Sequence, residues 1–296
     1  MNQATLDTAQ AMLRAMIAGV SCEHIAEAHG VTKSTVSQRT RLLASELQRV
    51  VGVLGVDEEE SPTAHLIRRY GADYLEALEH FVPSAAIPPD TAPGIVTPRQ
   101  IDQYVAKIAR HSRCVRRDSA LLLTLFATAA KPIEIAQLEV RDYLDAAGQV
   151  RCLSELRAEI GIGHSPRVLR FDCARTCAAI DAYLAERLRK GWGTHPQASY
   201  RGLAPGSRLF LSRKGQAMRI RQNGGATQQL LCKEIHEIYR RIFGYGGMPG
   251  IRTSCARRMA ASELKARGAG YREIGQVLGL KKLAVHKLLQ GEAPPR

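Results

Sequence analysis

The sequence predicts a mostly α-helical protein with a small β-sheet, an α+β fold in which a helix-turn-helix precedes a larger domain. Apolar residues recur at helical spacing through most of the chain, for example in residues 173–192. Short runs rich in β-forming residues occur near 148–153, 166–171 and 208–212. A stretch with five prolines, 83–98, interrupts the helical pattern. Helices therefore dominate, and the prolines separate two parts of the chain.

The proline-rich stretch guides the division into domains. We expect a helix-turn-helix domain over residues 1–55, a helical segment and Pro-rich linker over 56–96, and a larger domain over 97–296. Thr97 as a cap and Pro98 at the first helical position are typical of a helix start. The larger domain is therefore expected to begin with a helix directly after the linker.

Composition excludes several classes of protein. No apolar run approaches the length of a membrane span, and the first residues lack the basic and apolar pattern of a signal peptide. We therefore expect no membrane partner and a cytoplasmic, nucleoid-associated location. The seven cysteines are scattered, which favours reduced thiols. Cys173 and Cys177 lie four apart but have no second pair at a usable spacing, so we expect no metal site and no cofactor.

Positive charge is concentrated toward the end of the chain. Residues 1–100 hold 8 basic and 12 acidic residues, a net charge of −4, and residues 101–200 hold 15 and 11, a net +4. Residues 201–296 hold 19 basic and 5 acidic residues, a net +14. Such a concentration of one sign attracts a polyanion. The absence of an amphipathic aromatic anchor favours nucleic acid over a membrane surface.

The segment CEHIAEAHGVTKSTVSQRTRLLASELQ has the features of a helix-turn-helix in the right order. Ile25 and Ala26 face inward from a first helix, Gly30 ends it, and Val36 begins the buried stripe of a second helix. The phrase GVTKSTVSQR resembles the helix-turn-helix of sigma-factor and regulator families, although Thr40 stands where an apolar residue is commoner. The alternative is a plain helical hairpin.

The resemblance implies a DNA-binding domain that contacts double-stranded DNA through the second helix. The outward residues that we expect at the DNA are Thr32, Lys33, Ser34, Ser37, Gln38 and Arg41. Because helix-turn-helix proteins often bind two-fold sites as dimers, a homodimer on such a site is one assembly that this reading predicts.

From about residue 97 to 290, five phrases follow one another in an order that resembles the catalytic domain of tyrosine recombinases, the phage integrases. They are ALLLTLFATAAKPIEIAQLEVRDYL, GIGHSPRVLRF, SRLFLSRKGQAM, GIRTSCARRMAASELKARG and YREIGQVLGLKKLAVHKLL. The resemblance covers roughly two-thirds of the chain. It implies an integrase-catalytic-like domain. In that family a tyrosine attacks a DNA phosphate, while arginines, a lysine and histidines stabilise charge and move protons without a metal.

Most motif positions of that family hold unsuitable side chains here. The two arginine positions hold Lys131 and Arg252. The lysine, the two histidine and the tyrosine positions hold, in chain order, Ile162, Pro249, Leu280 and Leu289. These side chains neither transfer protons nor attack phosphate. We therefore expect no catalytic residues and no enzyme, with Lys131 and Arg252 kept to hold a DNA phosphate.

The last segment also fits a second helix-turn-helix. IGQVLGLKKLAVHK parallels IAEAHGVTKSTVSQ near the start of the chain. The alternative architecture is therefore a regulator with two helix-turn-helices around an unrelated middle. Both interpretations make Lys281, Lys282 and His286 candidate DNA contacts.

Together these patterns predict a non-enzymatic, site-specific DNA-binding protein, a transcription regulator of a bacterial chromosome or mobile element. The alternatives are an active recombinase with a displaced nucleophile (Tyr239, Tyr245 or Tyr271) and an accessory protein for recombination or partition. The residues of the last third that we expect nearest to DNA phosphates are Arg252, Arg257, Arg258, Lys281 and Lys282, with Lys131 joining them if the recombinase register holds.

Overall fold

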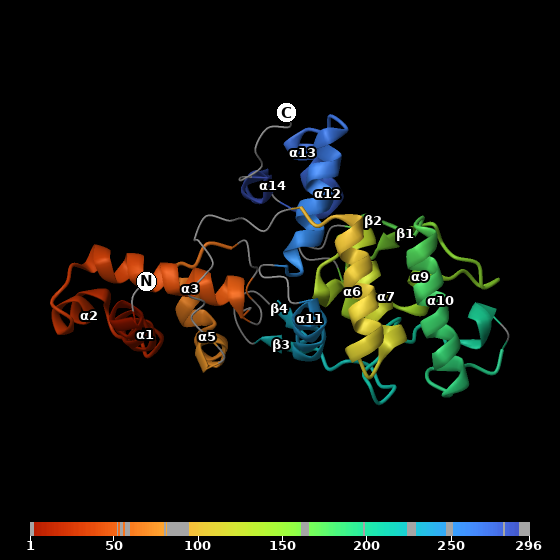
Figure 1. Cartoon of the computed structure of the whole chain (residues 1–296), viewed down its shortest axis with the longest axis horizontal. Helices are drawn as coiled ribbons and strands as arrows, with labels where there is room; N and C mark the ends of the chain where they lie inside the picture. Colours follow the sequence, from red (N-terminus) through yellow and green to blue (C-terminus); the bar gives the residue numbers. More distant parts are fainter. Residues whose placement is uncertain are drawn as a thin grey trace. The chain divides into compact units, whose positions relative to one another are not determined.

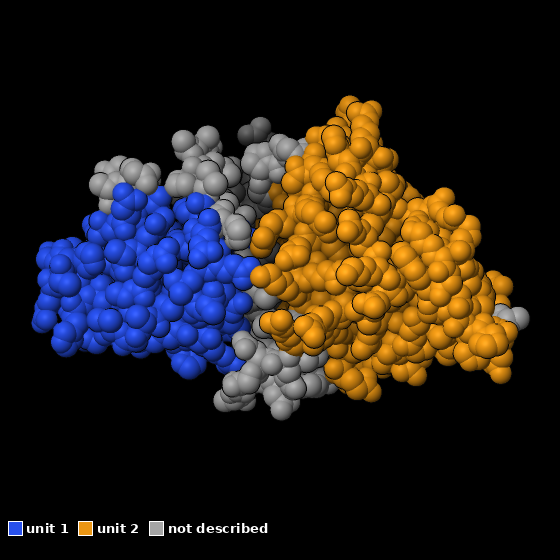
Figure 2. All heavy atoms as spheres, turned by 90° about the horizontal axis from the view of Figure 1, so that it is seen from below, with its two compact units in different colours: residues 1–89 blue, residues 90–296 orange. Residues whose placement is uncertain are grey.

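The computed structural model describes residues 3–51, 53, 56, 60–79, 81, 95–160, 166–197, 199–223, 229–246, 251–280 and 282–289. The chain divides into two compact units, Met1–Pro89 and Asp90–Arg296, coloured separately in Figure 2. Each unit has its own hydrophobic core.

The first unit is helical. Its elements are α1 (Gln3–Ile17), α2 (Cys22–Ala28), α3 (Lys33–Val50), α4 (Ala64–Arg69) and α5 (Gly71–Glu79). Helices α1, α2 and α3 pack on one another, and α4 and α5 pack against both α1 and α3. The segment that we expected to connect two domains therefore contributes Tyr70 and Tyr74 to the core of the first unit.

Two polar side chains join these helices. Arg68 of α4 donates from Nε to the carbonyl of Met16 (3.3 Å) and from Nη2 to that of Val20 (3.2 Å), which satisfies carbonyls at the end of α1. Gln48 of α3 donates to the buried hydroxyl of Tyr74 at 2.9 Å. These bonds tie α4 to the end of α1 and the residues after it, and α5 to α3.

The second unit combines helices with short strands. Its first half comprises α6 (Pro98–His111), α7 (Val115–Thr128), α8 (Pro132–Gln137), α9 (Val140–Tyr143), β1 (Leu153–Leu156), β2 (Arg167–Arg170) and α10 (Ala174–Arg189). Its second half comprises a 3₁₀ turn (Ser199–Gly202), β3 (Arg221–Asn223), β4 (Gln229–Leu231), α11 (Lys233–Gly246), α12 (Ser254–Ala266), α13 (Tyr271–Leu278) and α14 (Lys282–Leu289).

The strands form two-stranded antiparallel pairs, β1 with β2 and β3 with β4. The predicted fold class, mostly α with a small β-sheet, is confirmed. The run 166–171 contains β2, whereas β1 begins where the run 148–153 ends. The run 208–212 makes isolated bridges only, Glu139 with Arg208 and Leu211 with Ala217.

Helix α7 lies at the centre of the second unit. It packs against α6, α10, α11 and α12, and Figure 1 shows it beside α6 and α10. Helix α6 begins as expected, because Thr97 and Gln100 form a reciprocal capping box with Pro98 at the first turn. A smaller core lies among α12, α13 and α14, drawn in blue in Figure 1.

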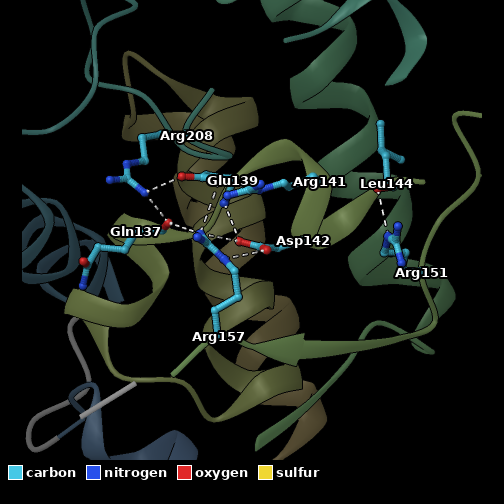
Figure 3. A network of polar contacts seen from close by, with 8 residues as sticks. All are labelled: Gln137, Glu139, Arg141, Asp142, Leu144, Arg151, Arg157 and Arg208. Carbon is cyan, nitrogen blue, oxygen red and sulfur yellow. Dashed lines mark hydrogen bonds and ion pairs between the residues drawn. The ribbon is translucent and has the colours of Figure 1, made fainter. Parts of the chain in front are cut away.

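A polar network holds the end of α8 and the start of α9 (Figure 3). Arg208 donates to the carbonyl of Gln137 (2.7 Å) and to the carboxylate of Glu139 (3.1 Å). Arg157, just after β1, donates to both oxygens of Asp142 at 3.1 Å and lies 3.4 Å from Glu139. Residues distant in sequence thus fix the segment after α8.

Candidate nucleic-acid interfaces

A tight turn joins α2 to α3 in the first unit. Gly30 has φ +62°, in the left-handed region that glycine adopts without strain. The next amide, of Val31, donates back to the carbonyl of Ala26 at 3.0 Å, which closes the end of α2. Thr32 then caps α3, its Oγ1 accepting from the amide of Thr35 at 3.2 Å. The predicted turn is therefore built from local backbone chemistry.

The candidate contact residues of α3 lie on its outer side. Thr32, Lys33, Ser34, Gln38 and Arg41 are exposed, and Ser37 is half-buried. On the inner side, Val36, Leu43 and Leu47 are fully buried. The apolar stripe of α3 thus turns a set of short polar and basic side chains toward solvent.

Lys33 has a partner that the sequence analysis did not foresee. Its ammonium forms an ion pair with Glu23 of α2, although both side chains are more than half exposed. The hydrogen bond to Glu23 raises the pKa of Lys33, and the same bond lowers the pKa of Glu23. Because the pair is exposed, it contributes little to stability. Glu23 nevertheless offsets the positive charge of Lys33 at the start of α3.

Thr40 departs from the usual pattern and is nevertheless buried. Its hydroxyl donates to the carbonyl of Val36 at 2.8 Å, one turn earlier in α3. A satisfied hydroxyl at this position replaces the apolar side chain without leaving an unpaired polar group in the core.

Lys131 lies between α7 and α8. Helix α7 ends at Thr128, and the next residue, Ala129, has a left-handed φ of +50° and belongs to the small core. The amide of Lys131 donates to Glu134 Oε2 at 2.8 Å, and Pro132 opens α8. The lysine is half-buried at this corner.

A buried ion pair behind Lys131 was missed by the sequence analysis. Arg167 of β2 donates to Glu134 Oε2 at 2.5 Å, and both side chains are at most 5% exposed. A Cβ added at Gly279, after α13, would lie 3.3 Å from Arg167 Nε. Arg167 therefore links α8, β2 and the end of α13. The only feature of the sequence that pointed to Arg167 was its position inside the short β-forming run 166–171.

The arginines around α12 differ in their exposure. Arg252, before the helix, is half-buried, and Arg257 is only 3% exposed. Arg258 is half-buried and donates from Nε to the carbonyl of Leu288 at 3.1 Å, which ties α12 to α14. Arg257 therefore lies in the interior and Arg258 joins two helices, while the half-buried Arg252 has its Nε atom buried.

At the end of the chain, Lys282 and His286 are exposed on α14, and Lys281 lies outside the described residues. The His286 ring lies 5.8 Å from that of Tyr271, the first residue of α13. Lys265 Nζ lies 4.7 Å from the centroid of the same tyrosine, a cation–π contact. A phenol, an imidazole and an ammonium are thus gathered beside the small core.

The other two tyrosines singled out in the sequence have different surroundings. Tyr239 is 1% exposed, and its hydroxyl donates to the carbonyl of Leu121 at 3.1 Å. Tyr245 is half-buried and its ring lies 5.8 Å from that of His111. Burial places Tyr239 out of reach of any substrate.

Of the remaining recombinase positions, Ile162 and Pro249 lie outside the described residues. Leu280 and Leu289 are half-buried and pack against the small core. In the part of the chain that the structure describes, no group of three or more histidine, cysteine or carboxylate side chains could hold a metal ion. No described helix is long and apolar enough to cross a bilayer.

Comparisons with known proteins yielded structural similarity alone. No protein-family model and no curated protein matches the sequence. Among solved structures, XerA recombinase is similar with a TM-score of 0.47 and 14% identity, over 93% of this chain and 92% of XerA. XerH site-specific recombinase bound to its difH substrate has the same TM-score and identity, over 77% of this chain and 62% of XerH.

The Tn1549 transposon integrase in complex with a circular intermediate DNA is similar with a TM-score of 0.42 and 16% identity, over 95% of each chain. At such identities the likeness concerns the fold alone.

These comparisons contradict the expectation that the chain is not an enzyme, because the similar structures are those of enzymes. That expectation rested on motif positions such as Leu280 and Leu289. Tyr271 packs against the same small core as those leucines, with Lys265 and His286 beside its ring.

Proposed function

We propose that the chain binds specific sites on double-stranded DNA, on a bacterial chromosome or mobile element. The observation that carries the proposal is the arrangement of α2, its glycine turn and α3, which matches the requirements of a helix-turn-helix. The exposed Ser34 and Gln38 can donate to and accept from base edges, and Arg41 can contact phosphate.

The two units contribute differently. The first unit belongs to the acidic third of the sequence, so its attraction to phosphates is weak and base contacts carry its preference. The last 96 residues hold a net charge of +14 and supply sequence-independent attraction. We assign contacts with DNA phosphates to Lys131, Arg252 and Lys282. Arg257 and Arg258 support the fold in this proposal, because Arg257 is buried and Arg258 bonds to the carbonyl of Leu288.

A genome-wide footprint of the full-length protein tests this proposal. We expect discrete protected sites that share a sequence. In Gln38→Ala we expect the protected sites to show a weaker sequence preference. Sites at promoters would favour transcription regulation, whereas a single attachment-like junction would favour recombination or an accessory role. Uniform occupancy without any shared sequence would contradict site-specific binding.

A second candidate function is DNA strand cleavage by a displaced tyrosine, and the surroundings of Tyr271 favour it. Lys265 and His286 lie against the tyrosine ring, where a cation stabilises a developing phenolate and an imidazole accepts its proton. In this reaction the phenol oxygen forms a bond to a DNA phosphorus. The bond from that phosphorus to the 5′ oxygen breaks, and the leaving oxygen takes up a proton.

A nicked suicide substrate that contains the selected binding site tests strand cleavage. An active tyrosine would give a protein–DNA band that survives denaturant and disappears in Tyr271→Phe. Tyr245→Phe is the matched control, because Tyr245 is also half-buried but packs beside His111. If wild-type protein binds the substrate but gives no such band, the cleavage proposal is wrong and the binding proposal is unaffected.

A further inference from the structure

The three helices at the end of the second unit repeat the backbone geometry of α1, α2 and α3. The first turn of each set ends in a left-handed glycine, Gly19 with φ +92° and Gly268 with φ +90°. The following amides bond back five residues, Val20 to Ala15 at 3.1 Å and Ala269 to Leu264 at 3.0 Å. Such helix ends are common, so this match alone would show little.

The second turn repeats at the same offset. Gly30 has φ +62° and Gly279 has φ +65°, so the two glycine pairs are each 249 residues apart. The amide of Leu280 donates to the carbonyl of Gly275 at 2.8 Å, as that of Val31 does to Ala26 at 3.0 Å. The helix starts match at the same offset of 249 residues. After the first turn, α2 begins at Cys22 and α13 at Tyr271, and after the second turn, α3 begins at Lys33 and α14 at Lys282.

The packing repeats as well. Ile25 and Ile274 are 2% and 0% exposed, and Val36 and Val285 are both fully buried. In each set a preceding helix packs on both others, α1 on α2 and α3, and α12 on α13 and α14. The two sets agree in both turns, in two buried positions and in which helices pack together, all at an offset of 249 residues. Unrelated helical hairpins have no physical reason to agree in this way.

The two copies differ in charge where they face solvent. In the first copy Glu23 pairs with Lys33. The equivalent residues of the second copy are Arg272 and Lys282, both exposed and both positive. Glu27 of the first copy is likewise replaced by the uncharged, exposed Gln276. The second copy therefore carries positive charge at two positions where the first copy has an ion pair, and such charge complements a phosphate backbone.

We propose that α12, α13 and α14 form a second helix-turn-helix whose α14 binds double-stranded DNA, so that one chain carries two DNA-contacting helix pairs. Lys282 and His286 occupy the places of Lys33 and Ser37. This inference rests on the proposed DNA binding and extends it to a second surface. The two copies have different roles in this proposal. Helix α3 contacts bases through short neutral side chains, and α14 contacts phosphates through its positive charge.

The experiment uses full-length protein and sites selected from a random DNA library, followed by footprinting. We expect wild type to protect two separate elements of DNA, one with a shared sequence and one without. Lys282→Ala, alone and with His286→Ala, should lose protection of the element without a shared sequence and lower the salt slope of binding by about 0.9 for each phosphate contact removed, while the other element stays protected. Gln38→Ala should show the converse. The single Lys282→Ala variant guards against a folding defect, because His286 also contacts Tyr271.

Arg240→Ala is the matched control, since Arg240 is an exposed cation on α11, outside both copies. It should leave both elements protected. An exchange variant, Arg272→Glu, would recreate the Glu23–Lys33 pair in the second copy and should reduce the salt dependence of binding. One protected element, lost in Gln38→Ala but unaffected by the α14 variants, would overturn the inference while leaving the proposed function standing. No protected element in wild type would overturn both.

Discussion

At the scale of single residues, the outer side of α3 combines weak charge with many hydrogen-bonding groups. Lys33 shares its ammonium with Glu23, whereas Gln38 is exposed and carries both a donor and an acceptor. Thr40 keeps the inner side closed by bonding to the carbonyl of Val36. The residue chemistry of this helix therefore favours recognition of bases over general attraction to phosphate.

Replacing Gln38 by alanine is expected to relax sequence preference without unfolding the protein. A well-placed amide–base pair contributes about 1–3 kcal/mol of discrimination. Lys33→Ala should have a smaller effect, because Glu23 already holds the ammonium. Fluorescence anisotropy with the selected site and a scrambled site measures both effects. Arg14→Ala, an exposed cation on α1, is the control. Unchanged affinity and preference in both α3 variants would exclude α3 from sequence readout.

Gly275 is required by the close approach of α13 to its own turn. A Cβ there would lie 2.5 Å from the carbonyl oxygen of Leu280, which is backbone and cannot swing away. We expect Gly275→Ala to lower the free energy of unfolding by about 1–3 kcal/mol. Gly244→Ala, in α11 with open space around it, should be neutral or stabilising by up to about 1 kcal/mol. Urea unfolding followed by fluorescence of Trp192, the chain's one tryptophan, measures both. Equal effects of the two variants would contradict the steric argument.

At the scale of elements, a buried ion pair between Glu134 and Arg167 joins helix α8 to strand β2, which packs beside α13. Glu134 and Arg167 are nearly inaccessible to solvent, so the ion pair stabilises the charge of each in the interior. An exposed pair on the same strand, Arg170 with Asp172 at 2.7 Å, lacks this burial.

Arg167→Leu is expected to destabilise the second unit by about 3–5 kcal/mol, because the buried carboxylate of Glu134 would lose its ion pair with Arg167. Arg170→Leu should change the free energy of unfolding by less than about 1 kcal/mol. Trp192 fluorescence in urea reports on this unit. If the double variant Arg167→Leu with Glu134→Leu is no more stable than Arg167→Leu, the uncompensated charge is not the cause.

Helix α11 carries a histidine that resists protonation. Burial, together with the charge of Arg240 one turn later, lowers the pKa of His236 from its ordinary value of 6.5 to about 4. Between these values the unfolded chain binds the proton and the folded chain does not, so protonation favours unfolding.

The stability that comes from neutral His236 is therefore present above pH 6.5 and is lost as the pH falls toward 4. We expect His236→Gln to reduce the difference in free energy of unfolding between pH 7 and pH 5. The exposed His111, changed to Gln, should leave that difference as in wild type. A wild-type pH dependence in His236→Gln would show that other groups cause it.

At the scale of the whole molecule, four arginines of the described residues are buried inside the fold: Arg117, Arg167, Arg187 and Arg257. Arg187 is fully buried and donates to the carbonyls of Arg208 (2.8 Å) and Leu209 (3.1 Å). Arg117 lies in the core beside Asp118, and Arg257 is also buried. The formal charge of the chain therefore overstates the charge at its surface, and the proposed DNA binding depends on the exposed cations of the last third.

Replacing Arg252, Lys281 and Lys282 together by alanine is expected to lower affinity for specific and random DNA alike. Each lost phosphate contact removes about 0.9 from the slope of log affinity against log salt. A control triple variant changes cations that carboxylates already hold: Arg141, Arg170 and Lys190. The control should keep the wild-type slope. The same slope in both triple variants would show that the first set faces solvent or another protein.

Several features could be predicted from the sequence because local chemistry decides them. The turn at Gly30, the buried Val36 and the cap at Thr97 follow from backbone geometry and side-chain spacing within a few residues. The parallel between the two helix-turn-helix phrases was visible as well. The expectation that the chain is not an enzyme is contradicted, because the solved structures similar in fold are those of enzymes.

The amino-acid sequence by itself determined the helical class, the concentration of charge and the local turns. The tertiary structure alone decided that Arg167 reaches Glu134, that Lys33 meets Glu23, and that Lys265 and His286 flank Tyr271. The physical reason is range: caps and turns involve neighbours in the chain, whereas ion pairs and ring contacts depend on how separate elements pack. The repeat of α1–α3 in α12–α14 lies between these cases. Its turns depend on residues close in the chain, whereas the matching packing of its helices is seen only in the tertiary structure.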